Sequence, residues 1–223
     1  MGLGDGPRWW DDYEWVDLSA LPAPAPPEPR RRTTRQRSGA ASAPPAAAPV
    51  PADLAPAEPD LLADALCALL TDSPLWIDVP GTRVLLVDLD NLRAGPARWR
   101  ARMAAVVTLA RQADRAHFAG QAGPVGRARP HLAEFADQAI AVADGSDVAD
   151  HVLLDAAAAD LAAADGPVQV LVVSNDGIFA DLAESGPLVV LSPGVEALSD
   201  RLDLAATDIL DLAGLEQDVV ASA

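Results

Sequence analysis

Short apolar runs alternate with stretches of helical periodicity along most of the chain, and this alternation limits the possible folds more than any other feature. The runs typical of strands are at 83–88, 116–119, 138–143, 168–174, 188–191 and 208–212. Strands that are separated by helices pair in parallel through right-handed crossovers, and helices cover both faces of the sheet. The pattern therefore predicts an α/β fold: a three-layer α/β/α sandwich with a mostly parallel central sheet.

The helices are expected between these strands. The helical stretches are 97–112, 127–136, 147–164, 177–184 and 194–200, of which 127–136 has the weakest pattern. Another helix is expected to begin at Asp60, because apolar residues recur there at helical spacing until Ser73 and Pro74 end the pattern. We therefore expect a leading helix and connector over 60–80 and the main domain over 81–223.

The first 59 residues differ in composition from the rest. Residues 20–59 are rich in proline and alanine, which predicts a disordered, extended linker because such a segment buries too little apolar surface to fold. Trp9, Trp10 and Trp15 lie among acidic residues in 1–18, a pattern typical of a protein-binding motif or of a flap that packs on its own domain. The alternative is a tail with no role of its own. The arginines of 30–37 form either a phosphate-binding arm or a solubilising part of the linker.

Composition excludes several classes of protein. Cys67 is the single cysteine, so a disulfide framework and a cysteine-based zinc site are excluded. The chain has no run of about 18 apolar residues and no signal-peptide pattern at its start, so we expect a cytoplasmic protein without a membrane span. The net charge is −17, and all 16 basic residues are arginine. This charge disfavours a conventional nucleic-acid binder.

Acidic residues follow three of the expected strands. Asp88, Asp90 and Asn91 follow the first, Asp144 and Asp147 the third, and Asp176 the fourth. Ligands of parallel sheets bind beyond the carboxyl ends of the strands, so these side chains are expected at one edge. Asp147, Asp150 and His151 are three and four residues apart and share a helix face.

Carboxylates brought together repel one another unless one is protonated or a divalent cation neutralises them. Oxygen ligands at an open site favour Mg²⁺ or Mn²⁺, which would suit phosphodiester hydrolysis. Each acid has an ordinary interpretation as well, since Asp and Asn often form turns or cap helices. We expect Asp90 to cap or point away, Asp155 to have a supporting or surface role, and His117, His131 and His151 to be structural or surface residues.

Three motifs at these positions resemble the NYN domain family of the PIN-like nuclease superfamily. They are an apolar strand ending in Asp88-Leu89-Asp90-Asn91, the segment Ser146-Asp147-Val148-Ala149-Asp150 at a helix start, and Ser174-Asn175-Asp176-Gly177-Ile178-Phe179 after an apolar strand. The resemblance covers roughly 80–212. It implies a PIN-like sandwich, a Mg²⁺ or Mn²⁺ site and hydrolysis of RNA to a 5′-phosphate and a 3′-hydroxyl.

The resemblance also implies a role for each motif residue. Asp88, Asp150 and Asp176 would coordinate the metal, and Asn91 would position a ligand or water. Asp147, Ser174 and Asn175 would support the site. The sequence departs from the family at two places: Ile178 stands where many members have a second acid, and the basic residue often found near the middle motif is missing.

RNA is the partner that this interpretation requires. Between Asn91 and Arg115 the arginines outnumber the acids, and Arg93, Arg98 and Arg100 lie closest to the first motif. They are the expected phosphate contacts, either on single-stranded or on structured RNA. Trp99 would either stack on a base or, as we expect, belong to the core.

Two other functions fit parts of the sequence. A catalytically inactive PIN-like module that binds RNA or protein is consistent with Ile178 and with the aromatic–acidic segment 1–18. A haloacid-dehalogenase-like phosphatase is suggested by Asp88 and Asp90, which resemble the nucleophile motif of that family, and by Ser174. The phosphatase is disfavoured because Arg201 is the only basic residue after Ser174.

Overall fold

The computed structural model describes residues 57–72, 75–143, 145 and 147–223. The predicted linker, the aromatic–acidic segment and the arginine cluster at 30–37 lie outside these residues. Six strands form one sheet, in which every neighbouring pair is parallel. The predicted α/β fold is confirmed, with a sheet that is entirely rather than mostly parallel.

The strand order is β3-β2-β1-β4-β5-β6. The strands are β1 (Thr82–Asp88), β2 (Arg115–Gln121), β3 (Ala139–Val142), β4 (Val168–Val173), β5 (Leu188–Ser192) and β6 (Asp208–Asp211). The chain builds outward in one direction from β1 to β3, and then crosses back to build β4, β5 and β6 on the other side of β1. The order therefore reverses between β1 and β4, the position where a crevice forms at the carboxyl ends of the strands.

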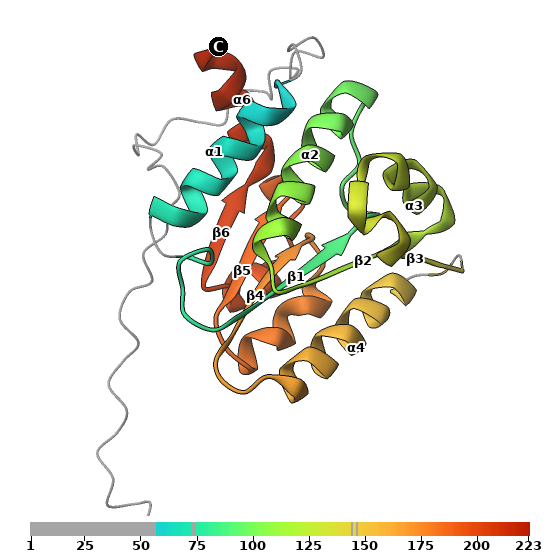
Figure 1. Ribbon diagram of the computed structural model, residues 1–223, viewed down its shortest axis with the longest axis vertical. Coiled ribbons are helices and arrows are strands. Elements are labelled where there is room, and N and C mark those ends of the chain that lie inside the picture. Colours follow the sequence, from blue (N-terminus) through green and yellow to red (C-terminus); the bar gives the residue numbers. More distant parts are fainter. Residues whose placement is uncertain (1–56, 73–74, 144, 146) are drawn as a thin grey trace, which may run out of the picture. The chain divides into compact units, whose positions relative to one another are not determined.

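Helices cover both faces of the sheet (Figure 1). One face carries α1 (Pro59–Asp72), α2 (Pro96–Gln112), α3 (Ala122–Ala128) and α6 (Leu212–Ser222), and the other carries α4 (Val148–Ala163) and α5 (Asp200–Ala205). Short 3₁₀ helices complete the chain: η2 (Arg129–His131), η3 (Ala133–Gln138), η4 (Gly177–Glu184) and η5 (Val195–Ala197).

The central strands supply the core to both faces. All six residues of β4 are buried, as are the last five of β1. Alternate residues of a strand point to opposite faces, so Leu85 and Val87 pack under α2 while Val84 and Leu86 pack under α4. Strands that are buried on both faces have continuous apolar sequences, which is why these were the clearest strands in the sequence.

The leading helix α1 is part of the same core. Leu62, Leu66 and Leu70 are fully buried at helical spacing, and they belong to one cluster with α2 and the sheet. Trp76, in the connector, is also fully buried, and its indole Nε1 donates to the Gln169 carbonyl of β4. The segment predicted as a separate leading helix and connector thus packs into the domain that follows it.

The C-terminal part differs most from the sequence prediction. The helix expected at 194–200 is replaced by η5 and by α5, which begins at Asp200. The helix α6 was not predicted. It contains Gly214, a poor helix former, but Asp211 caps it by accepting a hydrogen bond from the Ala213 backbone N–H. The weak helical pattern at 127–136 is a series of short turns, α3, η2 and η3.

Among the described residues, no helix combines the length and the apolar character needed to cross a bilayer.

Candidate metal centre

The candidate site lies where the strand order reverses. Asp88 is the last residue of β1, Asp176 follows β4 after a short turn, and α4 begins next to them after its chain leaves β3. This strand order is also typical of dinucleotide-binding folds, but those have a glycine-rich loop after the first strand. Here that loop reads Asp88-Leu89-Asp90-Asn91, so it presents carboxylates instead of a phosphate cradle.

Three carboxylates meet at this edge. Asp147, Asp150 and Asp176 each place one carboxylate oxygen within 4.8 Å of the other two. A single cation with oxygen ligands at roughly 2 Å needs a spacing of this kind. The sequence prediction brings Asp150 and Asp176 together correctly, and the third member of the group is Asp147, which was expected only to support the site.

The backbone of Asp147 explains how its side chain becomes available. Asp147 has a φ of +63° and occupies the cap position of α4, where its carbonyl accepts from the His151 N–H. Its carboxylate makes no capping hydrogen bond to the helix. Asp is among the residues that tolerate this left-handed conformation, and such conformations are concentrated at functional sites.

The surroundings of Asp150 strongly raise the pKa of its carboxyl. The residue is 8% exposed in the first turn of α4. Burial, followed in decreasing order by the charges of Asp88, Asp176, Asp147 and Asp90, raises the pKa of its carboxyl to about 7. Like charges held together in this way favour either a proton or a cation on one of them. A cation bound at this group would therefore compete with a proton on Asp150.

Asp88 has a different environment. It is 2% exposed, and both of its oxygens accept hydrogen bonds: Oδ1 from the Asp90 N–H at 2.9 Å, and Oδ2 from the Ser174 hydroxyl at 3.0 Å and from the Asn91 amide. Burial raises the pKa of Asp88, while these hydrogen bonds act in the opposite direction. Asp88 stands outside the group of three, close enough for its charge to act on Asp150.

The turn after β4 is held by hydrogen bonds that begin at Asp176. The Asp176 N–H donates to Ser174 Oγ at 3.1 Å, and Asp176 Oδ1 accepts from the Ile178 N–H at 3.0 Å as the cap of η4. Ser174 therefore links the backbone of Asp176 to the carboxylate of Asp88. The supporting role of Ser174 in a metal site stays a prediction, and these contacts are the basis on which it would act.

Asn175 is also buried, but it faces the loop after β5. Its amide oxygen accepts from Ser192 Oγ at 2.6 Å, and its amide nitrogen donates to the Gly194 carbonyl at 3.1 Å. Ser192 was missed in the sequence, although it ends a strand at the same edge. The sequence analysis considered mainly the acids at the ends of the strands. Considering every polar residue at these positions would have identified Ser192.

The other acids and the histidines considered in the sequence are not members of the group of three. Asp90 accepts from the Gln121 N–H with both oxygens, at 3.2 and 3.0 Å, and so ties the first motif to the end of β2 instead of capping α2. Asp155 and His151 are exposed on α4. His117 contacts Asp160 at 2.7 Å, and His131 is exposed.

The three arginines expected to contact phosphate follow the first motif in the sequence. Arg93 and Arg100 are exposed, and Arg93 Nε donates to the Asp90 carbonyl at 3.1 Å. The side chain of Arg98 is 47% exposed and is paired with Glu216 of α6, a partner that the sequence did not predict. Trp99 is a core residue at 2% exposure, with the Arg127 guanidinium 4.7 Å from its ring centroid.

Comparisons with protein-family models and with curated proteins gave no match to this chain.

Proposed function

We propose that the protein is a metal-dependent ribonuclease that hydrolyses RNA phosphodiesters at the edge formed by Asp147, Asp150 and Asp176. The observation that carries the proposal is the convergence of three carboxylate oxygens within 4.8 Å, one of them on the buried Asp150. Within the described residues, no arginine or histidine is paired with any of these three acids. Their repulsion is therefore left for a ligand to offset.

The donor set fits a hard divalent cation. All three groups are carboxylates, and Asp147 and Asp176 are more exposed than Asp150, which leaves one side of the group open to solvent and substrate. Oxygen ligands of this kind suit Mg²⁺ or Mn²⁺. When bound, such a cation supplies a Lewis acid that activates water and neutralises charge on a phosphate.

The residues around the three acids would support the bound cation and the RNA. Asp88 adds negative charge beside Asp150, and Asn91 and Ser174 hold its carboxylate in place. Asn91, whose amide is within reach of the same edge, also orients a water or a substrate oxygen. Arg93, Arg98 and Arg100 contact RNA phosphates beside the acids. The resemblance to the NYN family supports this assignment and implies a PIN-like relationship for the fold.

Cleavage of single-stranded RNA by the full-length chain tests the proposal. In Mn²⁺, we expect Asp150→Asn, Asp176→Asn and Asp88→Asn each to lower the rate at least about 100-fold, because each removes charge from the cation environment. Asp155→Asn is the matched control, since Asp155 is exposed on the same helix as Asp150. Equal rates for the wild type and the three site variants would contradict the proposal.

The alternatives make different predictions in the same experiment. A PIN-like module without activity would bind RNA but not cleave it, and the presence of Ile178 in place of an acid favours that outcome. For a haloacid-dehalogenase-like phosphatase, Asp88 would have to attack a phosphate. The burial of Asp88 and the hydrogen bonds to both of its oxygens count against a nucleophilic role. Trapping of a phosphoaspartate at Asp88 would support the phosphatase.

A further inference from the structure

A group of three charged residues, of which Arg102 and Glu216 are buried and Arg98 is exposed, joins α2 to α6. Arg102 donates from Nε to Glu216 Oε1 at 2.7 Å and from Nη2 to Oε2 at 3.0 Å, while Arg98 donates to Oε2 from Nε at 2.9 Å and also from Nη2. Arg102 and Glu216 are 3% and 4% exposed. A buried charge is strongly unfavourable once its partner is removed, so this contact fixes the two helices relative to each other.

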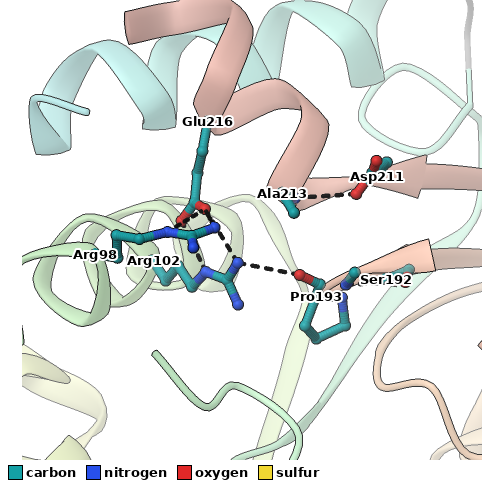
Figure 2. Close-up of polar contacts among 8 residues, drawn as sticks. Arg98, Arg102, Ser192, Pro193, Asp211, Ala213 and Glu216 are labelled. Carbon is teal, nitrogen blue, oxygen red and sulfur yellow. Dashed lines mark hydrogen bonds and ion pairs between the residues drawn. The ribbon is translucent and has the colours of Figure 1, made fainter. Parts of the chain in front are cut away.

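Arg102 extends this contact to the loop after β5. Its Nη2 also donates to the Pro193 carbonyl at 3.0 Å. Figure 2 shows the Arg102 guanidinium between Glu216 on one side and Pro193 on the other, with Ser192 next to Pro193. The hydrogen bond to the buried guanidinium restricts where the Pro193 carbonyl can lie. Because the same guanidinium is bound to Glu216 of α6, α6 helps to hold the loop after β5 in place.

The same loop holds Asn175 through its side chain. Ser192 Oγ donates to the Asn175 amide oxygen and accepts from the Gly194 N–H at 3.2 Å, and the Asn175 amide nitrogen donates to the Gly194 carbonyl. The backbone carbonyl of Asn175 accepts from the Ser199 N–H at 3.0 Å. The loop after β5 therefore binds both the amide oxygen and the amide nitrogen of the buried Asn175. Asn175 directly precedes Asp176 in the chain.

We propose that α6 positions the Asp176 carboxylate through a continuous chain of contacts, from Glu216 to Arg102, to Pro193 and Gly194, and to Asn175. Glu216, Arg102, Ser192 and Asn175 are positioning residues and do not touch substrate. The consequence for cation binding rests on the proposed function. The chain of contacts itself does not, because every link lies within the protein.

Hydrogen exchange in the full-length, metal-free protein tests the chain of contacts. The reporters are the N–H groups of Gly194, Asp176 and Ile178, which donate to Ser192 Oγ, Ser174 Oγ and Asp176 Oδ1. We expect Glu216→Gln, at the start of the chain, and Ser192→Ala, which removes the hydroxyl bonded to Asn175, each to speed exchange at these three amides at least tenfold. The amides of β2, which lie outside the chain, serve as the reference within each variant.

Leu212→Ala is the control for loss of stability alone. Leu212 is fully buried at the start of α6 and makes no contact in the chain. We expect this variant to lower the stability of the whole domain through the shared core while the Glu216–Arg102 pair stays in place, so exchange at the three reporter amides should be unchanged relative to β2. If Leu212→Ala speeds the reporters as much as Glu216→Gln does, or if neither Glu216→Gln nor Ser192→Ala speeds them, the inference is wrong.

Mn²⁺ titration adds the functional readout. We expect Glu216→Gln and Ser192→Ala to weaken Mn²⁺ binding about three- to tenfold, and Leu212→Ala to bind as the wild type does. Unchanged affinity in the first two variants, despite faster exchange, would overturn the positioning role. Absence of Mn²⁺ binding in the wild type would contradict the proposed function instead, and the exchange experiment would still decide whether α6 holds the Asp176 loop.

Discussion

Asp150 is a buried acid that lies among other acids. It is buried at the start of α4, and acids from β1, from the turn after β4 and from its own helix surround it. Removing a carboxylate from water and placing it beside other carboxylates costs free energy in its charged form. A site of this kind is less stable than an apolar one would be, which is typical of residues retained for binding or catalysis.

The pH dependence of stability follows from the pKa of Asp150. In the unfolded chain an Asp carboxyl titrates near pH 4, while in the folded protein its pKa is raised to about 7. The proton is therefore bound more tightly in the folded state. The stability that this group contributes is fully present below about pH 4 and is lost as the pH rises through 7.

Asp150→Asn tests this directly. The amide cannot ionise, so we expect the variant to unfold at a higher temperature than the wild type at pH 8, by an amount corresponding to about 2 kcal/mol, and to lose this advantage at pH 4. Thermal unfolding followed by circular dichroism at both pH values, without divalent cations, measures the difference. Asp155→Asn is the control, and an advantage of equal size at both pH values would contradict the assignment.

At the residue scale, the sequence predicted part of the site. The carboxyl ends of parallel strands identified Asp88 and Asp176, and helical spacing identified Asp150. The prominence of Asp147 could not be predicted, because it depends on a left-handed backbone that turns its side chain away from capping. The pairing of Arg98 with Glu216 depends on α6, so no local pattern around Arg98 could reveal it.

At the element scale, α2 offers a matched pair of arginines. Arg98, in the first turns, and Arg111, in the last turn, have side chains that are 47% and 53% exposed, and each is paired with a glutamate. Because β1 runs into the loop before α2 and β2 follows it, the two arginines lie toward opposite edges of the sheet. Only Arg98 is at the edge that carries the acids.

This difference predicts the RNA contact. In EDTA, so that no cleavage intervenes, Arg98→Gln should weaken binding of single-stranded RNA and reduce the slope of log K against log salt by about 0.7, the value for one phosphate contact. Arg111→Gln should leave both unchanged. Fluorescence anisotropy over a salt series gives the slopes, and equal losses in the two variants would indicate a nonspecific charge effect instead.

The packing of α1 makes a second prediction at this scale. Leu66 is fully buried and Leu69 is 42% exposed on the same helix. Leu66→Ala should lower the free energy of unfolding by about 2–5 kcal/mol, because it opens a cavity in the shared core, whereas Leu69→Ala should change it by less than about 0.5 kcal/mol. Urea unfolding gives both values. A small effect at Leu66 would show that α1 is dispensable for the domain.

The helices and strands that are buried in the core were the ones that the sequence predicted best. The buried strands and α4 were predicted to within a few residues because their periodicity depends on local sequence. The missing helix α6 and the misplaced helix at 194–200 lie where short segments are held by capping side chains, Asp211 and Ser199. Such segments depend on contacts with the rest of the chain more than on their own pattern.

At the scale of the whole molecule, a net charge of −17 would be expected to repel RNA. The proposed RNA substrate is compatible with this charge because of where the acids and the arginines lie. Acids from three parts of the chain gather at the reversal of the strand order, while the arginines proposed to contact phosphate come from the loop after β1 and from the start of α2. A cation at the acids would lower the negative potential at the point where a phosphate must approach. A bound cation is therefore expected to strengthen RNA binding, and bound RNA to strengthen cation binding.

Asp147, Asp150 and Asp176 are proposed to hold one divalent cation. Isothermal titration of the full-length protein with Mn²⁺ at pH 8, above the raised pKa of Asp150, measures this binding. We expect a single site in the wild type and in Asp155→Asn, and loss of that site in the double variant Asp150→Asn/Asp176→Asn. Binding of Mn²⁺ with the same stoichiometry and affinity by the wild type and the double variant would contradict it.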